Sequence, residues 1–180
     1  MALRHIVTQE DKILHKVCRE QVKFDERLHQ LLDDMAETLE NANGVGLAAP
    51  QVGILRRVVL VIETNVEDEE DEEILELINP VIVKNEGEQV GAEGCLSVPG
   101  IYADVVRPES ITVEYYNENL EKVTETFDKF GCRMVQHELS HLDGCIFTDL
   151  VAPIRKKMVA GKLNNIARGK VGTQYKAKIK

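Results

Sequence analysis

Residues 136–144 of the chain read Gln136-His137-Glu138-Leu139-Ser140-His141-Leu142-Asp143-Gly144, which contains the pattern His-Glu-x-x-His. Residues four apart on a helix share one face, so His137 and His141 can direct their imidazoles to one point. Two such nitrogens form part of a site for a divalent metal, most simply zinc or ferrous iron. Glu138 lies one step round the helix, where it can exchange a proton with water beside the metal without ligating the ion. The stretch therefore predicts a metal-binding helix with hydrolytic chemistry.

Two histidines need a third ligand, and the sequence leaves several candidates. One zinc peptidase class has a third His six residues after His141, but that residue is Phe147; another has a downstream Glu, but none follows Glu138. Cys95 is preceded by Gly94, which allows the backbone to approach another element closely. A thiolate there would complete a Cys-His-His site with one open position. From the residues alone, the remaining competitors are Asp143, Asp149, Cys132 and Cys145.

Length and composition are ordinary for a globular protein of one domain. Its 180 residues are 43% hydrophobic and 29% charged, which is enough to bury one core without disulfides. No apolar run reaches membrane-spanning length, and the N-terminus lacks the core of a signal peptide. Four scattered cysteines do not form a disulfide framework. We therefore expect a cytoplasmic protein with no membrane partner.

The net charge of −9 is unevenly distributed. Residues 150–180 hold nine Lys and Arg and no Asp or Glu, which leaves 13 basic and 31 acidic residues before them. An acidic body does not favour nucleic-acid binding, whereas the basic C-terminal part could approach a polyanion. The unbroken acidic run at residues 67–73 is predicted to be a solvated loop, because its charges repel one another.

The pattern of elements predicts an α+β fold with mainly antiparallel sheets around the metal-binding helix and with a C-terminal helix. Asp25 can cap an amphipathic helix that runs to about residue 40. We expect one catalytic domain over residues 1–166 and a basic, flexible tail over 167–180. The other expected elements are a helix at 9–17, strands at 57–62 and 77–84, a hairpin of 110–116 and 120–127, and helices at 128–143 and 153–165.

Three blocks together resemble the signature motifs of the peptide deformylases, in the same order along the chain. They are Gly44-Val45-Gly46-Leu47-Ala48-Ala49-Pro50-Gln51, Glu93-Gly94-Cys95-Leu96-Ser97 and the stretch at residues 136–144. The resemblance covers roughly residues 1–166. This sequence differs in having Ser140 where many members have Asp, and in its long acidic insertion. Neither difference falls on a residue to which the resemblance assigns chemistry.

The resemblance implies removal of the N-formyl group from the initiator methionine of nascent polypeptides, with release of formate. It implies one divalent metal held by Cys95, His137 and His141, with Fe²⁺ preferred and Zn²⁺, Ni²⁺ or Co²⁺ able to replace it. Glu138 would move the proton. The side-chain amide of Gln51 and the backbone N–H of Leu96 would stabilise the oxyanion.

The resemblance also implies where the substrate lies. Gly46 would pair with the extended peptide through its main chain, and Val45, Met134 and Glu93 would lie at the methionine pocket. Family members are commonly monomers that act near the ribosome, which the basic C-terminal helix could contact.

Three rival interpretations are weaker. A non-enzymatic binding module with the same fold should have lost at least one of the residues Gln51, Cys95, His137, Glu138 and His141, and none is lost. The alternative function is that of a general zinc peptidase. This alternative is weakened because both of the usual downstream ligands are missing. A dinucleotide-binding loop at residues 44–49 is also disfavoured, because polar residues precede it and Pro50 interrupts it.

Overall fold

The computed structural model of the chain describes residues 2–63, 72–170, 172–173, 175 and 177–178. Most of the acidic run, residues 67–71, lies outside the described part, so the predicted loop there stays a prediction. The larger elements are helices α1 (Glu26–Asn41), α2 (Lys129–Leu142) and α3 (Pro153–Ala167) and strands β3 (Val58–Ile62), β4 (Ile74–Glu86), β5 (Gln89–Cys95), β6 (Val98–Arg107), β7 (Ser110–Tyr116) and β8 (Lys122–Asp128). The shorter ones are strands β1 (Ile6–Val7), β2 (Gly46–Ala48) and β9 (Ala177–Lys178) and 3₁₀ turns η1 (Lys12–His15), η2 (Ala49–Val52) and η4 (Phe147–Asp149).

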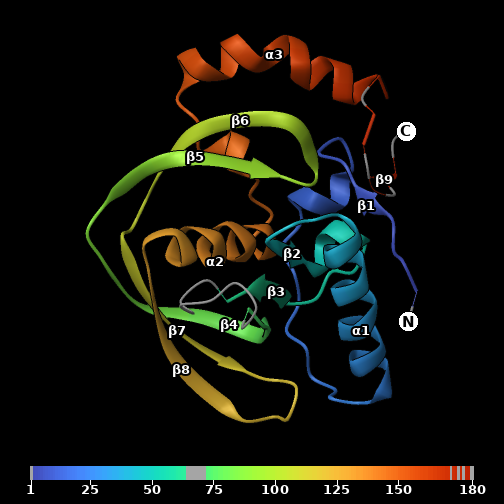
Figure 1. The fold of residues 1–180 in the computed structure, drawn as a ribbon, viewed down its shortest axis with the longest axis vertical. Coiled ribbons are helices and arrows are strands. Elements are labelled where there is room, and N and C mark those ends of the chain that lie inside the picture. The colour runs from blue at the N-terminus through green and yellow to red at the C-terminus, as the bar shows by residue number, and fades with distance from the viewer. Residues whose placement is uncertain (1, 64–71, 171, 174, 176, 179–180) are drawn as a thin grey trace.

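Helix α2 lies at the centre of the molecule, between two antiparallel sheets (Figure 1). On one side is the five-stranded sheet, in the order β2-β3-β4-β7-β8; on the other is the long hairpin of β5 and β6. Eleven of the fourteen residues of α2 are buried. A helix covered on both sides cannot be polar on one face, so its buried polar residues need partners within the protein or a ligand.

Strand β3 of the five-stranded sheet is buried on both faces. Its Val59 and Val61 pack towards α2, while Val58 and Leu60 pack towards α1. Side chains alternate along a strand, so an unbroken apolar run must meet a core on each face. The sequence prediction of a buried strand here is confirmed.

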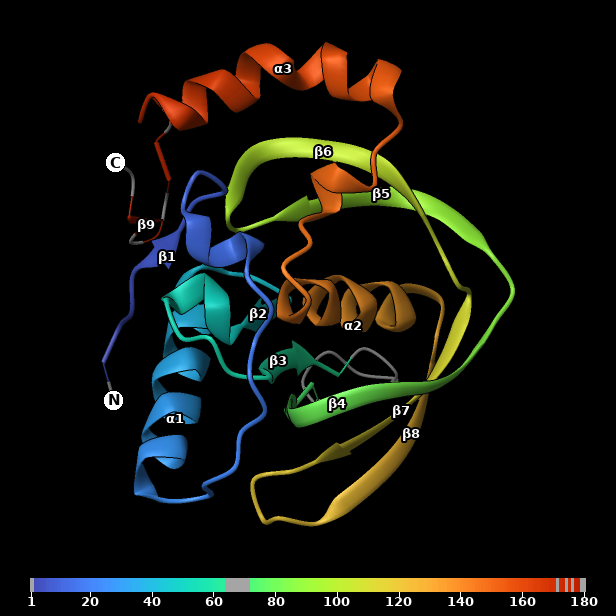
Figure 2. The same cartoon turned by 180° about the vertical axis from the view of Figure 1, so that it is seen from behind.

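Helix α1 covers the face of the sheet that α2 leaves open. Asp25 caps it by accepting hydrogen bonds from the backbone N–H groups of Arg27 and Leu28. Its leucine stripe, which includes Leu32 and Leu39, is buried against β2 and β3. Helix α3 packs instead on β6, on the side of the hairpin away from α2, as the view from behind also shows (Figure 2).

The fold class is as predicted from the sequence, but several boundaries differ. The expected helix at residues 9–17 is only the 3₁₀ turn Lys12–His15. Strand β4 is longer than predicted and shifts register between Ile78 and Val81, because Pro80 cannot donate a hydrogen bond to the ladder. Helix α3 ends at Ala167, and beyond it β9 pairs in parallel with β1. Among the described residues, no helix is long and apolar enough to cross a membrane.

Candidate active site and metal centre

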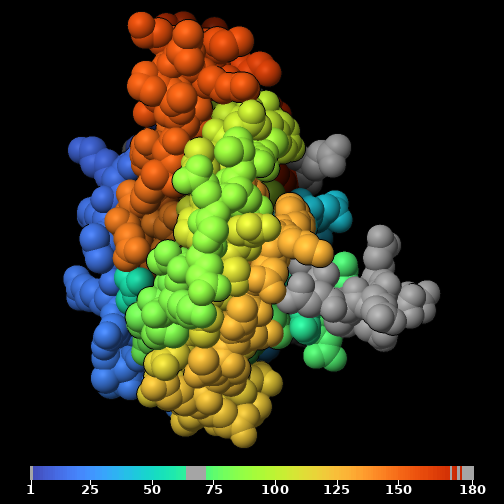
Figure 3. Space-filling model, turned by 90° about the vertical axis from the view of Figure 1, so that its left-hand side faces the viewer, coloured from blue at the N-terminus to red at the C-terminus, as the bar shows by residue number. Residues whose placement is uncertain are grey.

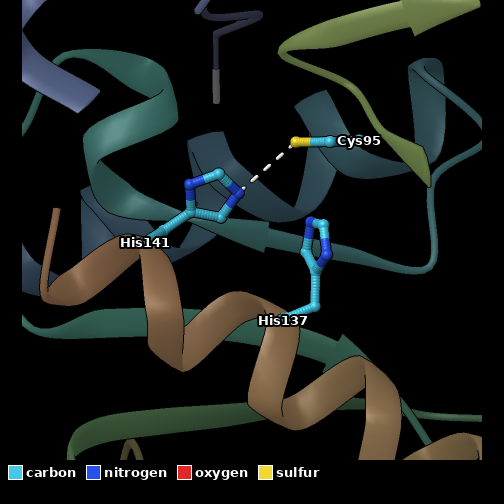
Figure 4. A group of neighbouring side chains, drawn as sticks. All are labelled: Cys95, His137 and His141. Atoms are coloured by element: carbon cyan, nitrogen blue, oxygen red, sulfur yellow. Dashed lines mark hydrogen bonds between the residues drawn. The ribbon is translucent and has the colours of Figure 1, made fainter. Parts of the chain in front are cut away.

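One thiol and two imidazoles converge from separate elements. His137 and His141 lie one turn apart on α2, and Cys95 ends strand β5 (Figure 4). One ligand atom from each lies within 4.8 Å of the other two, and the Cys95 sulfur is 3.4 Å from Nε2 of His141. This group does not include the other candidates for the third ligand, which were Asp143, Asp149, Cys132 and Cys145. The structure thus brings together the three residues that the resemblance named.

This donor set fits a single divalent ion. Metal–sulfur bonds of about 2.3 Å and metal–nitrogen bonds of about 2.0–2.1 Å place tetrahedral ligands roughly 3.4–3.7 Å apart. The 3.4 Å between Cys95 and His141 already matches this spacing. Burial lowers the pKa of His141 well below its usual value, and nearby His137 and Arg107 lower it further. Its imidazole is therefore neutral, which is the form that ligates a metal.

His137 is oriented by a buried carboxylate. Its Nδ1 lies 2.8 Å from Oε1 of Glu93, which directs the opposite ring nitrogen to the thiol. Glu93 also accepts two hydrogen bonds from Arg107, at 2.7 and 2.8 Å, and one from Arg133 at 2.8 Å. Burial alone would raise the pKa of Glu93, but the hydrogen bonds from Arg107 and His137 hold it at about 2. A charged carboxylate behind a ligating histidine fixes the ring and its tautomer.

Arg107 is the functional residue that sequence reasoning missed. It is buried, and besides Glu93 it donates to Ser140 Oγ at 3.0 Å. The available signal was alternation: Ile101, Ala103 and Val105 of β6 are buried, and Arg107 continues that series. A charged residue at an inward position of a strand needs a buried partner, which here is Glu93.

Glu138 lies beside the three candidate ligands with one carboxylate oxygen unengaged. The carboxylate is buried, and among the described residues its Oε2 has no hydrogen-bond partner. A Cβ atom on Gly46 would lie 2.6 Å from Oε1, so the glycine leaves room for this side chain. Burial raises the pKa of Glu138 to about 7. Such a carboxylate can accept and return a proton near neutral pH.

Gln51 and Leu96 lie next to the Cys-His-His group. The Gln51 side chain is held by its own oxygen, which accepts from the backbone N–H of Ala48 at 2.8 Å. Its amide nitrogen lies 3.4 Å from the Cys95 sulfur and 3.2 Å from Ser97 Oγ. Leu96 follows Cys95 directly, so its backbone N–H belongs to the same short segment.

A cavity of about 700 Å³ opens onto this group and is lined by all four residues that the resemblance assigned to substrate binding: Val45, Gly46, Glu93 and Met134. Val45 is 47% exposed, whereas Met134 is buried in the cavity wall. Tyr102 and Phe130 add exposed aromatic rings to the rim. Gly94 lets the Tyr102 ring approach, because a Cβ there would lie 2.5 Å from it.

An α+β fold with a Cys-His-His group whose histidines are buried, an adjacent glutamate and an open cavity is typical of metal-dependent hydrolases with a single metal ion. The polypeptide deformylase family model matches residues 3–157. The chain belongs to the peptide deformylase family, whose members are metalloenzymes that remove the N-formyl group from nascent peptides.

Individual peptide deformylases are similar to this chain along most of its length. Peptide deformylase 2 of Clostridium acetobutylicum is 51% identical over 152 residues, covering 84% of this chain and 97% of that protein. The peptide deformylase of Christiangramia forsetii is 38% identical and covers 97% of this chain and 94% of its own. A crystal structure of a peptide deformylase from Legionella pneumophila is 36% identical, with a TM-score of 0.84 over 93% of this chain and 96% of that one.

Proposed function

We propose that the residues around the cavity divide the deformylation reaction among them as the resemblance implies. Cys95, His137 and His141 would hold one divalent ion, and the spacing of their donor atoms and the lowered pKa of His141 support this assignment. When bound, the ion acts as a Lewis acid and lowers the pKa of water. Glu93, Arg107 and Arg133 keep His137 in its ligating orientation.

Glu138 carries the proton. Its carboxylate lines the cavity and accepts a proton from the water that attacks the formyl carbon. As the carbon–nitrogen bond breaks, the same carboxyl delivers that proton to the departing amine, and formate is the other product. A pKa of about 7 suits both halves of this transfer, because the driving force is small in each direction.

Gln51 and Leu96 stabilise the negative oxygen that forms on the formyl group. The Gln51 amide is fixed by its bond from Ala48 and directs its N–H groups towards Cys95. The Leu96 backbone N–H would be the second donor. Donors held in place before the reaction need no rearrangement in the transition state, and removing one typically costs about 10²–10³-fold in kcat.

The methionine side chain occupies the cavity beside Val45 and Met134, and the peptide pairs with the bare backbone at Gly46. The Glu93 carboxylate is fully engaged by four donor atoms. We therefore propose that it contributes to the pocket as part of the wall and through His137, with no direct bond to the substrate.

Fe²⁺ is our proposal for the ion used in the cell, with Zn²⁺, Ni²⁺ or Co²⁺ as substitutes. One soft sulfur and two imidazoles suit all of these ions. Metal content of protein purified without oxygen, measured together with formate release, distinguishes them. The zinc peptidase alternative is not favoured, because the family match identifies deformylases.

The proposed division of roles is tested with a formyl-methionyl peptide. Metal-loaded protein should release formate, and Glu138→Ala should retain one metal per chain but lose nearly all turnover. Substantial activity in this variant would refute the proton-transfer role. An ordinary unformylated peptide library serves as the control for general peptidase activity and should remain uncut.

We further propose that the enzyme acts in the cytoplasm as a monomer and contacts the ribosome through α3, where nascent chains emerge. Four basic residues of α3 are exposed: Arg155, Lys156, Lys157 and Lys162. Deleting the helix would uncover the apolar cluster that Leu163 and Ile166 join, so charge reversal is the cleaner test. Figure 3 shows α3 at the top of the molecule, above β5 and β6.

Reversing Lys156, Lys157 and Lys162 together to Glu should abolish co-sedimentation with ribosomes and leave turnover of a short peptide unchanged. Unchanged co-sedimentation would remove the ribosome proposal. Light scattering of the wild-type chain tests the monomeric state.

A further inference from the structure

The chain beyond α3 returns to the active-site cavity. Gly169, with φ of +66°, turns the chain at the end of α3. Its N–H donates to Ile166 and that of Lys170 donates to Asn165, which closes the last helical turn. Gly172, Thr173 and Tyr175 then line the cavity that holds Cys95 and Glu138.

Tyr175 makes the most specific contact of this segment. Its hydroxyl donates a hydrogen bond to the backbone carbonyl of Leu96. Its ring packs on the apolar cluster of α1, β2 and β3, which the Leu96 side chain also joins. Thr173 Oγ1 donates to the Tyr175 carbonyl at 2.7 Å. Burial raises the pKa of Tyr175 to about 12, so its hydroxyl keeps its proton at neutral pH.

Both ends of the chain thus hold the segment that carries the thiol. From the N-terminal side, the Gln9 N–H donates to the carbonyl of Ser97 at 2.9 Å. From the C-terminal side, Tyr175 holds the carbonyl of Leu96. The two ends are joined to each other, because β1 and β9 pair in parallel. The segment from Cys95 to Ser97 is therefore fixed by contacts that come from outside the three signature motifs.

We propose that Tyr175 is a positioning residue for deformylation, which holds Leu96 so that its backbone N–H faces the developing oxyanion. The proposal rests on the role assigned above to Leu96. The N–H of Leu96 lies in the peptide plane before its Cα and the C=O in the plane after it, so with the carbonyl anchored only the φ and ψ rotations of Leu96 can turn the N–H away. Small errors in donor position reduce transition-state stabilisation more than substrate binding.

The test compares Tyr175→Phe with Tyr116→Phe in the full-length chain. Tyr116 ends β7, outside the cavity lining, and its variant removes a hydroxyl without touching Leu96. Losing one hydrogen bond of about 1 kcal/mol corresponds to roughly a 5-fold effect. Tyr175→Phe should lower kcat about 5-fold, with KM for a formyl-methionyl peptide changed less than about 2-fold. Tyr116→Phe should match the wild type.

A second readout does not depend on activity. Amide hydrogen exchange in the peptide spanning residues 95–98 should be about 5-fold faster in Tyr175→Phe, with or without zinc. Tyr175→Ala, which also removes the ring, should show at least the same changes. The proposal would be overturned if both Tyr175→Phe and Tyr175→Ala kept the kcat and the exchange rates of the wild type. A change in KM without a change in kcat would also overturn it. If the wild type releases no formate, the assigned function fails, and exchange still decides whether Tyr175 holds Leu96.

Discussion

Gly46 and Glu138 lie so close that no side chain fits between them: a Cβ on Gly46 would meet Oε1 of Glu138 at 2.6 Å and its Cγ at 2.8 Å. The glycine of the first motif therefore leaves room for the carboxylate of the third motif. Real Cβ contacts essentially never fall below 3.0 Å, so any larger residue must displace the glutamate or the strand.

Gly46→Ala should lower kcat by about 10-fold or more, because the carboxylate that carries the proton is pushed away from the reacting water. Steady-state formate release measures this. The control is Gly161→Ala on α3, where a Cβ would meet nothing within 4 Å. That variant should keep full activity and gain about 0.5–1 kcal/mol of stability, since alanine favours a helix. Wild-type turnover in Gly46→Ala would contradict the close contact.

Glu93→Gln should weaken both folding and metal binding. It leaves the buried guanidinium groups of Arg107 and Arg133 without their carboxylate, which typically costs about 3–5 kcal/mol. Loss of the hydrogen bond to His137 should lower metal affinity about 10–100-fold. Urea unfolding and competition with a chelator measure the two effects.

The matched control is Asp104→Asn, which breaks the exposed pair with Arg155 on the surface. Exposed pairs contribute about 0–1 kcal/mol, so stability should hardly change. If Glu93→Gln and Asp104→Asn lowered the free energy of unfolding equally, the Glu93 network would not be a structural element of the site.

Stability should decline from mildly acidic to neutral pH because of Glu76 on β4. Burial, together with smaller contributions from Glu118 and Asp33, raises its pKa to about 7. The ordinary value is 4.5, so between about 4.5 and 7 the unfolded chain ionises this carboxyl while the folded chain resists. The contribution of Glu76 to stability is therefore fully present below its pKa in the unfolded chain, and it is lost as the pH rises through its pKa in the folded chain.

Glu76→Gln should therefore be more stable than the wild type at pH 8, by on the order of 1–2 kcal/mol after allowance for partial exposure. At pH 5 the advantage should largely disappear. Urea unfolding at both pH values measures it, and Glu86→Gln, at an exposed position of the same strand, is the control. An advantage that does not depend on pH would rule out this titration.

Removing the metal with a chelator should abolish turnover but leave the protein folded. Its three apolar clusters pack through helices and strands, and of the three ligands only Cys95 borders one of them. Far-UV circular dichroism should be unchanged, and adding the metal back should restore activity. Unfolding on chelation would mean that the ion contributes to folding itself, as in small zinc domains.

The local elements around the site could be predicted because their signals are local. The helix at residues 128–143 is confirmed as α2, and the cap at Asp25 lies at the start of α1. The expected helix at 9–17 was wrong, since only four of those residues form a 3₁₀ turn. Leu14 is the one residue of that turn that is buried, so the segment has no long apolar face to hold a helix against the core.

The amino-acid sequence by itself determined which groups are available: two histidines one helical turn apart, a glutamate between them, and a cysteine in a glycine-containing segment. Helical periodicity is a property of neighbouring residues, so it can be read without coordinates. Only the tertiary structure decided which distant groups meet. Arg107 reaches Glu93 from another strand, and Tyr175 reaches Leu96 across 79 positions. Such contacts depend on how sheets, hairpins and chain ends pack, and no short-range pattern encodes that packing.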